Sequence, residues 1–337
     1  MKLRFIALIF LLAQFLAAPA RIWQTDTLGL PFQVTYFSQP SDNVGPARSS
    51  LVRLLPDSAC GNGKALVYIH GFNDYFFQTE MAHEFADHGY AFYAVDLRRY
   101  GRSLQDGDKR CMIRNFKDYF PDLDSAFCEI SAAGYDSVVL MGHSTGGLLA
   151  SYYMAVSPPQ QVRMMILNSP FLDWNLGSKE CLIGLVSSLG RLFPDISFSS
   201  GSSTAYGESL LKGKHGEWNF NTDWKSIEPT KVNLGWVRAV TSAQRWLRSH
   251  PDCIDVPILL LYSSVSVNLD EWTPEAQSAD AVLDVADIRS LGMRLSDDVT
   301  AFKVNGGIHD LFLSSAPVRE QLYQRVFDWL GEEWRKQ

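Results

Sequence analysis

Short apolar runs alternate with amphipathic segments along most of this chain. The runs predicted to be strands covered on both faces are 65–69, 91–95, 137–141, 164–167, 256–262 and 299–304. Between them, residues 79–88 place Met81, Ala82 and Phe85 on one side of a helix, and residues 118–133 repeat apolar positions at spacings of three and four. This alternation is typical of a mostly parallel sheet whose strands are connected by helices. The sequence therefore predicts an α/β fold with a mostly parallel central sheet and flanking helices.

The two ends of the chain frame this alternating region. Residues 33–38 and 50–55 have strand-like patterns, and the segment 39–49 between them is rich in turn-forming residues. We predict that these two strands form an opening antiparallel pair. At the other end, Pro317 opens a closing helix with one apolar face.

The alternation stops from Phe171 to about Cys253. Five of the nine tryptophans lie in this segment, so it is more than a linker, and residues 182–192 predict an amphipathic helix. An insertion at the carboxyl end of a strand lies over the crevice where open α/β sheets bind ligands. We therefore predict a helical cap at about 171–253.

The first residues differ from the rest of the chain. A basic start precedes an almost wholly apolar run at 5–18, and small residues follow up to Ala20. This is the pattern of a secretory signal peptide, and the apolar run is shorter than the roughly 20 residues of a membrane-spanning helix. We predict a signal peptide at 1–20, one folded domain at 21–337, and a secreted or periplasmic protein. An uncleaved membrane anchor is the alternative.

Composition narrows the classes of partner. The 337 residues carry a formal net charge of -7 and contain no long run of Lys or Arg, which argues against a nucleic-acid partner. The five cysteines are too widely spaced for a zinc site and too few for a disulfide scaffold. The sequence leaves their pairing and the oligomeric state open.

The candidate chemistry begins where the run 137–141 ends. Gly-His-Ser-Thr-Gly follows at 142–146, and apolar residues at helical spacing come next. A serine on a sharp turn between a strand and a helix has a strained backbone, and glycines two residues before and after it avoid collisions with its neighbours. We predict that Ser144 is a nucleophile. The N–H of Thr145, at the start of the helix, is a predicted oxyanion donor.

A serine nucleophile needs a base within hydrogen-bond reach and a third group that orients the base. Seven histidines are present. Among them, His309 alone follows the last predicted strand after a flexible Gly306-Gly307 pair, which can carry an imidazole over the carboxyl edge of the sheet. We predict that His309 is the base. This chemistry calls for no metal and no organic cofactor.

Four motifs of the chain resemble those of the α/β-hydrolases. The motifs are Ile-His-Gly-Phe at 69–72, Asp-Leu-Arg-Arg-Tyr-Gly-Arg-Ser at 96–103, Gly-His-Ser-Thr-Gly-Gly at 142–147 and Gly-Gly-Ile-His-Asp at 306–310. They are similar to the monoacylglycerol lipase and lysophospholipase-like branch, which also takes in serine aminopeptidase-like sequences. The resemblance implies an α/β-hydrolase fold with an inserted helical cap. It also implies an oxyanion hole formed by the N–H groups of Phe72 and Thr145, and a structural role for Asp96.

The acid that orients the histidine departs from the family pattern. In the family the strand before it ends in His-Gly-x-x-Asp, whereas the corresponding stretch here ends in Ser266. Asp280 resembles the family's catalytic aspartate, because a few mostly apolar residues separate it from a polar residue that starts the next helix. Asp284 is that polar residue and is better suited to cap the helix. We predict that an insertion at 267–278 displaces Asp280, which still orients His309. The alternatives are Asp284, Asp270 and Asp287.

These predictions together describe acyl transfer. The histidine takes the serine proton, an acyl-enzyme forms, and water releases the acid. We expect a serine hydrolase that cleaves lipid-like or small acyl esters of the monoacylglycerol or lysophospholipid type, with transient contact between the cap and a lipid surface. One alternative is a peptidase that removes amino-terminal residues. Another is a non-catalytic binding protein on the same fold, which the missing aspartate at position 266 suggests.

Overall fold

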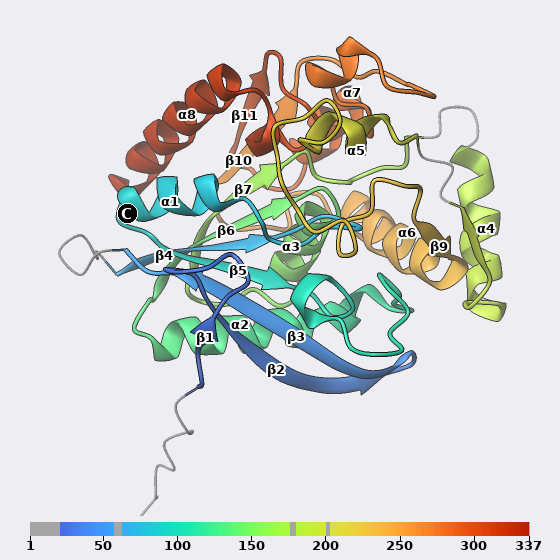
Figure 1. Cartoon of the computed structure of the whole chain (residues 1–337), viewed down its shortest axis with the longest axis horizontal. Helices are drawn as coiled ribbons and strands as arrows, with labels where there is room; N and C mark the ends of the chain where they lie inside the picture. Colours follow the sequence, from blue (N-terminus) through green and yellow to red (C-terminus); the bar gives the residue numbers. More distant parts are fainter. Residues whose placement is uncertain (1–20, 57–62, 176–179, 200–202, 337) are drawn as a thin grey trace, which may run out of the picture.

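The protein is built around a central sheet (Figure 1). The computed structural model describes residues 21–56, 63–175, 180–199 and 203–336. The predicted signal peptide, residues 1–20, lies outside the described residues. Within the described residues, nine strands form one sheet in the order β1-β2-β3-β5-β4-β6-β7-β10-β11. Their bounds are Gln24–Thr25 (β1), Gln33–Asp42 (β2), Gly45–Leu54 (β3), Lys64–Ile69 (β4), Ala91–Asp96 (β5), Ser137–His143 (β6), Val162–Asn168 (β7), Ile258–Ser263 (β10) and Val299–Val304 (β11).

The sheet is parallel over most of its width. Parallel pairs join β5 to β4, β4 to β6, β6 to β7, β7 to β10 and β10 to β11. The remaining pairs, which join β1, β2, β3 and β5, are antiparallel. The predicted mostly parallel sheet is therefore confirmed. Because the carboxyl ends of parallel strands meet at one edge, the loops after β4, β6 and β11 are brought together there.

The opening strand pair is longer than the sequence predicted. β2 and β3 remain paired up to Asp42, so the predicted turn at 39–49 is wrong in extent. Asp42 explains the tight reversal, because its carboxylate accepts the N–H of Val44 at 2.8 Å. Two buried arginines bind the same carboxylate, Arg98 at 3.1 Å and Arg99 at 2.8 Å. A turn held by these polar contacts allows both strands to continue into it.

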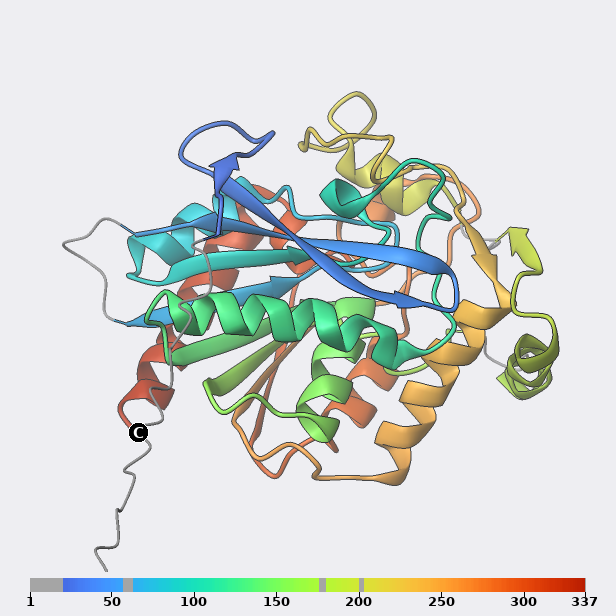
Figure 2. The same cartoon turned by 90° about the horizontal axis from the view of Figure 1, so that it is seen from below.

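Helices cover both faces of the sheet and divide the core into two parts (Figure 2). On one face, α1 and α8 bury Met81, Phe85 and Leu322. On the other face, α2, α3 and α7 bury apolar residues that include Leu123 and Ile288. The helix bounds are Thr79–Asp87 (α1), Phe120–Ala132 (α2), Thr145–Val156 (α3), Glu180–Leu192 (α4), Ala205–Leu210 (α5), Leu234–Ser249 (α6), Val285–Gly292 (α7) and Ala316–Trp334 (α8). Short 3-10 helices lie at Gly101–Ser103, Phe116–Tyr119, Pro274–Gln277 and Leu311–Leu313.

The inserted segment, residues 171–253, lies between β7 and β10. It contains α4, α5, α6 and a small antiparallel pair, β8 (Ser197–Ser199) with β9 (Lys231–Asn233). The described residues outside this segment are called the body. α6 packs on the core of the body through residues such as Trp236. α4 packs on α6 and lies at the outer edge of the molecule in both views (Figure 1, Figure 2). Across the described part of the chain, none of the helices has both the length and the apolar character needed to cross a membrane.

Candidate active site

Ser144 lies on the sharp turn between β6 and α3. Its φ of +52° and ψ of -117° are backbone angles that residues with a side chain rarely adopt. A Cβ at Gly142 would lie 2.4 Å from the carbonyl oxygen of Gly146, and a Cβ at Gly146 would lie 2.4 Å from the carbonyl oxygens of Ile69 and His70. The two glycines therefore avoid the predicted collisions and allow the strand, the turn and the helix to pack closely.

Three of the predicted site residues meet beside this turn. His309 Nε2 lies 3.0 Å from Ser144 Oγ, and His309 Nδ1 lies 2.9 Å from Asp280 Oδ2. All three side chains are buried, and Ser144 keeps 8% of its surface exposed. In this arrangement the His309 ring can accept the proton of the Ser144 hydroxyl. The Asp280 carboxylate accepts the Nδ1–H of the ring and stabilises a positive charge on it. The ring comes from the loop after β11, where Gly306 has a φ of +72°.

Asp280 reaches the end of β10 after a detour of the chain through the predicted insertion at 267–278. The returning backbone pairs with the extension of β10, so that Asp280 bridges Ser266 in parallel register. Its N–H donates to the carbonyl of Val265 at 2.9 Å, and its carbonyl accepts the N–H of Val267 at 2.9 Å. The other carboxylate oxygen accepts the N–H groups of the second and third residues after it, at 2.9 and 2.8 Å. The carboxylate therefore lies beside the position that the family pattern assigns to it.

The other acids considered have different surroundings. Asp284 is the N-cap of α7, and its carboxylate accepts the N–H of Ala286 at 2.8 Å, which is the capping role predicted for it. Asp287 lies in the first turn of α7, and Asp270 is exposed. Of these four acids, Asp280 is the one that hydrogen-bonds to His309.

The two predicted oxyanion donors lie on different chain segments. Thr145 is the first residue of α3, where N–H groups have no partner within the helix. Phe72 lies on the loop after β4 and directly follows Gly71. A Cβ at Gly71 would lie 3.3 Å from Ser144 Cβ, so this loop passes close to the nucleophile turn. The two predicted oxyanion donors thus belong to chain segments that adjoin the serine.

His70 fixes the start of the loop that carries Phe72. Its Nε2 accepts the N–H of Leu97 at 3.1 Å, so the proton lies on Nδ1, which donates to the carbonyl of Gly71 at 2.7 Å. Burial lowers the pKa of His70, which favours the neutral ring that this bonding requires. His70 is therefore a support of the loop and not a second base.

A buried ionic network supports the same loop at Phe76. Asp96 accepts the N–H of Phe76 at 3.0 Å and a bond from Arg102 at 2.8 Å. Arg102 also binds Asp26 at 2.6 Å and thereby joins the first residues of the described chain to the sheet. These contacts agree with the structural role that the resemblance implied for Asp96.

A wall of aromatic rings that the sequence analysis did not predict borders Ser144. The N–H of Phe171 donates to the Ser144 carbonyl at 3.0 Å. Ring centroids then lie 4.9 Å apart for Phe171 and Trp174, 5.9 Å for Trp174 and Trp236, and 4.4 Å for Trp236 and Phe72. This aromatic wall runs from Phe171, which is hydrogen-bonded to Ser144, to the loop that carries Phe72. The concentration of tryptophan in the inserted segment indicated packing but could not identify these partners.

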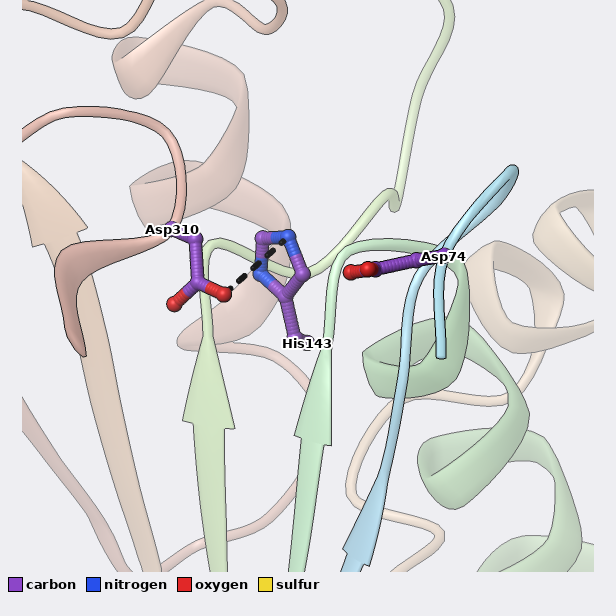
Figure 3. A group of neighbouring side chains, drawn as sticks. All are labelled: Asp74, His143 and Asp310. Carbon is purple, nitrogen blue, oxygen red and sulfur yellow. Dashed lines mark ion pairs between the residues drawn. The ribbon is translucent and has the colours of Figure 1, made fainter. Parts of the chain in front are cut away.

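A second histidine lies beside His309, with the ring centroid of His143 at 4.9 Å. Asp310 and Asp74 lie on opposite sides of the His143 ring (Figure 3), and Asp310 Oδ2 is 4.0 Å from His143 Nε2. Among the described residues, Asp74, His143 and Asp310 are a buried group with the atoms and the spacing for a metal ion. However, Lys225 Nζ from the inserted segment lies 2.8 Å from Asp74 Oδ1 and already supplies a positive charge. We therefore assign Asp74 to an ion pair.

Burial and hydrogen bonding keep His143 out of proton transfer. Burial lowers the pKa of His143 well below its usual range, and neighbouring His309 adds to this shift. The neutral ring donates its Nδ1–H to the carbonyl of Asn168 at 3.2 Å. Burial raises the pKa of Asp310, whose oxygens accept the amide N–H groups of Asn168 at 2.7 Å and Gln78 at 3.2 Å. These groups form a fixed polar support beneath the nucleophile turn.

Known proteins share this sequence pattern. A family model described as serine aminopeptidase, S33, matches residues 62–314. A probable lysophospholipase L2 of Haemophilus influenzae is 26% identical over 219 residues, which are 60% of this chain and 67% of that protein. These matches confirm the resemblance to the monoacylglycerol lipase and lysophospholipase-like branch.

Solved structures share the fold. A soluble variant of the monoglyceride lipase of Saccharomyces cerevisiae, in complex with a substrate analogue, matches with a TM-score of 0.62 at 16% identity, covering 94% of this chain and 95% of that one. The monoacylglycerol lipase of Paleococcus ferrophilus matches with a TM-score of 0.62 at 17% identity, covering 84% and 98%. At these identities the likeness shows the fold alone, and the predicted α/β-hydrolase fold is confirmed.

Proposed function

We propose that this chain, which belongs to the serine aminopeptidase S33 family of α/β-hydrolases, cleaves carboxylic esters through an acyl-enzyme on Ser144. The observation that carries this proposal is the chain of hydrogen bonds from Asp280 through His309 to the Ser144 hydroxyl, at 2.9 and 3.0 Å. A hydroxyl is a weak nucleophile at neutral pH, and this arrangement supplies both the base and the group that orients it.

In the proposed mechanism, the Ser144 hydroxyl attacks the ester carbonyl while His309 Nε2 takes its proton. The N–H groups of Phe72 and Thr145 stabilise the oxyanion that forms on the carbonyl oxygen. The imidazolium, held by Asp280, then gives its proton to the leaving alcohol. Water repeats the sequence on the acyl-enzyme, with His309 again as the base, and releases the carboxylic acid and the free serine.

The aromatic wall supports an apolar acyl substrate. It joins Phe171, next to Ser144, to Phe72 of the oxyanion loop through two tryptophans of the inserted segment. Pockets for small molecules are typically lined by apolar and aromatic groups with a few placed polar groups. We therefore propose that residues 171–253 act as a cap that selects lipid-like or small acyl chains.

The exposed side of α4 supports contact of the cap with a lipid surface. Leu185 is 61% exposed and Leu192 is 71% exposed on this helix, which lies at the edge of the molecule. We expect the protein to co-sediment with phosphatidylcholine vesicles and the variant Leu185→Glu/Leu192→Glu to stay in solution while it hydrolyses a soluble ester at the wild-type rate. Leu30→Glu, at a position 79% exposed in the body, is the matched control and should still co-sediment. Equal binding of the α4 variant would exclude this surface.

Short-chain and long-chain p-nitrophenyl esters test the proposed reaction. We expect hydrolysis by the purified protein and its loss in Ser144→Ala. A fluorophosphonate probe should label the wild type and not Ser144→Ala, because labelling requires an activated serine. A wild type that neither hydrolyses any ester nor takes up the probe would favour the non-catalytic binding protein instead.

Peptidase activity is the second candidate, and the description of the matching family favours it. Removal of amino-terminal residues requires carboxylates that hold the substrate ammonium. The cap residue Glu217 is paired with Arg319 at 3.1 Å, and Glu208 lies 4.0 Å from Lys214. Asp74, near the nucleophile, is paired with Lys225. Aminoacyl-naphthylamides are the discriminating substrates, and we expect their cleavage to be far slower than ester hydrolysis.

We also propose that the chain is exported, on the strength of the signal-peptide pattern at 1–20. Expression of the full chain in a secreting bacterial host, followed by amino-terminal sequencing of the product, tests this. We expect a mature protein that begins after Ala20. A product that keeps residues 1–20 and is found in the membrane fraction would favour the uncleaved anchor.

A further inference from the structure

A lysine of the inserted segment lies buried against the loop that follows β4. Lys225 is 6% exposed and Asp74 is 1% exposed, and Lys225 Nζ lies 2.8 Å from Asp74 Oδ1. The same carboxylate oxygen accepts the N–H of Tyr75 at 2.9 Å. Since Asp74 stands two residues after Phe72, this ion pair joins the inserted segment to the loop that carries a proposed oxyanion donor.

Hydrogen bonds next to the ion pair join the same two segments and a third one, the loop that carries Arg110. The Asn73 amide donates to the carbonyl of Ser226 at 2.7 Å, and the N–H of Ser226 donates to the Asn73 side chain at 3.3 Å. Arg110 donates to the carbonyl of Trp224 at 2.8 Å. Asn73 has a φ of +50°, a left-handed conformation that asparagine adopts more readily than most residues with a side chain. The inserted segment is therefore one of the supports of this loop, together with His70 and Asp96.

The energetics of a buried ion pair indicate what this contact does. Removing both charges from water offsets most of their attraction, so such a pair adds little net stability compared with apolar packing. It does fix the relative position of the two groups. An oxyanion donor works only when it lies about 2.7–3.1 Å from the oxyanion. A contact that fixes geometry next to Phe72 therefore affects the reaction more than it affects the fold.

We propose that Lys225 is a positioning residue for the oxyanion hole. Its pair with Asp74, supported by the Asn73 and Ser226 contacts, holds the loop after Gly71 so that the Phe72 N–H stays in place as a donor. The inserted segment thereby completes the catalytic machinery in addition to covering it. This inference rests on the proposed function.

Steady-state kinetics with p-nitrophenyl butyrate test this role. Lys225→Met keeps the length of the side chain and removes its charge. We expect kcat to fall about 100-fold with KM changed by less than about threefold, since misplacement of a reacting group by about 1 Å has an effect of this order. Affinity for a trifluoromethyl ketone, which forms an oxyanion on the serine, should fall by a similar factor. Lys225→Arg should recover part of both losses, and Lys212→Met, an exposed lysine of the same segment, should behave as wild type.

A double variant separates positioning from folding. Lys225→Met alone leaves a buried carboxylate without a positive charge beside it and lowers the melting temperature. Lys225→Met/Asp74→Asn removes both charges, so its melting temperature should return toward that of the wild type while kcat and ketone affinity stay low. A double variant with wild-type kcat would overturn the proposal, as would a folded Lys225→Met with unchanged kcat.

The result also distinguishes this inference from the proposed function. An inactive wild type that does not take up the fluorophosphonate probe contradicts the proposed function itself. An active, probe-labelled wild type whose Lys225→Met variant retains full kcat contradicts the positioning role alone.

Discussion

His309 and His143 lie side by side, with ring centroids 4.9 Å apart, and both are buried next to carboxylates. The two surroundings differ in their hydrogen bonds. His309 has Asp280 at 2.9 Å from Nδ1 and the Ser144 hydroxyl at 3.0 Å from Nε2. His143 donates its Nδ1–H to a backbone carbonyl, and the nearest oxygen of Asp310 is 4.0 Å from Nε2, too far for a hydrogen bond.

The difference shows that a histidine near a carboxylate is not by itself a catalytic pair. Asp280 directs one oxygen at the ring of His309, and backbone N–H groups hold its other oxygen. Asp310 directs its oxygens at amide groups of the body. One carboxylate can stabilise a charge on its histidine, whereas the other joins the end of β7 to the loops after β4 and β11. Variants of each carboxylate test this contrast.

Asp280→Asn is expected to have the largest effect. Its amide would favour the wrong tautomer of His309, so kcat/KM for p-nitrophenyl butyrate should fall by about 10⁴-fold, the loss seen when the acid of a serine triad is replaced by its amide. The melting temperature should change little, because the amide oxygen can still accept the backbone N–H groups of Val282 and Leu283.

Asp284→Asn is the matched control for that variant. Asparagine caps helices about as well as aspartate, so α7 should stay folded and kcat/KM should stay within about threefold of wild type. If Asp284→Asn lost more activity than Asp280→Asn, the acid would have been assigned to the wrong residue.

Asp310→Asn is expected to affect stability more than activity. Both oxygens of Asp310 accept hydrogen bonds, from Asn168 at 2.7 Å and Gln78 at 3.2 Å. The NH₂ group of the new asparagine is a donor and would face the donor of Asn168 or of Gln78. The unfolding free energy should therefore fall by about 1–3 kcal/mol. We expect kcat/KM to stay within about tenfold of wild type, because His309 keeps its own acid. Urea denaturation and ester kinetics measure the two effects. A loss of activity equal to that of Asp280→Asn would place the His143 group in the reaction.

Sequence patterns predicted those residues of the candidate site whose placement depends on local chain geometry. Ser144 could be predicted because glycines at fixed positions reveal the sharp turn, and His309 because two glycines follow the last strand. Asp280 required a comparison with the family pattern, since the detour at 267–278 separates it from its strand. The bridge between Asp280 and Ser266 forms only in three dimensions, and it explains why the acid lies beside a serine at the expected position.

The rest of the site depends on contacts between distant segments. The strands were predictable because buried parallel strands are continuous apolar runs. No pattern along the sequence shows which residue of the inserted segment faces which residue of the body. The pairing of Lys225 with Asp74 and the packing of Trp236 on Phe72 join positions far apart in the sequence. The turn at Asp42 was misjudged for the same reason, because Arg98 and Arg99 that bind it come from another strand's end.

The smallest expected effect is a change in the pH dependence of stability in His143→Asn. The folded-state pKa of His143 is lowered, so the unfolded chain binds a proton there more readily than the folded protein. Stability from this group is therefore complete above the usual histidine pKa of 6.5 and is lost as the pH falls below it. The wild type should lose up to about 1.4 kcal/mol per pH unit more than the variant in this range. Urea denaturation between pH 7.5 and 5.5 measures the difference.

The comparison of the two slopes isolates His143 from the other buried groups. Burial lowers the pKa of His70, which acts in the same direction, and burial raises the pKa of Asp122 to about 6, which acts in the opposite direction. Both groups are present in the wild type and in His143→Asn, so their contributions cancel in the difference. Equal slopes would mean that folded His143 takes up a proton as readily as the unfolded chain does. In that case His143 and Asp310 would form a second charged pair beside His309, and the contrast between the two histidines would fail.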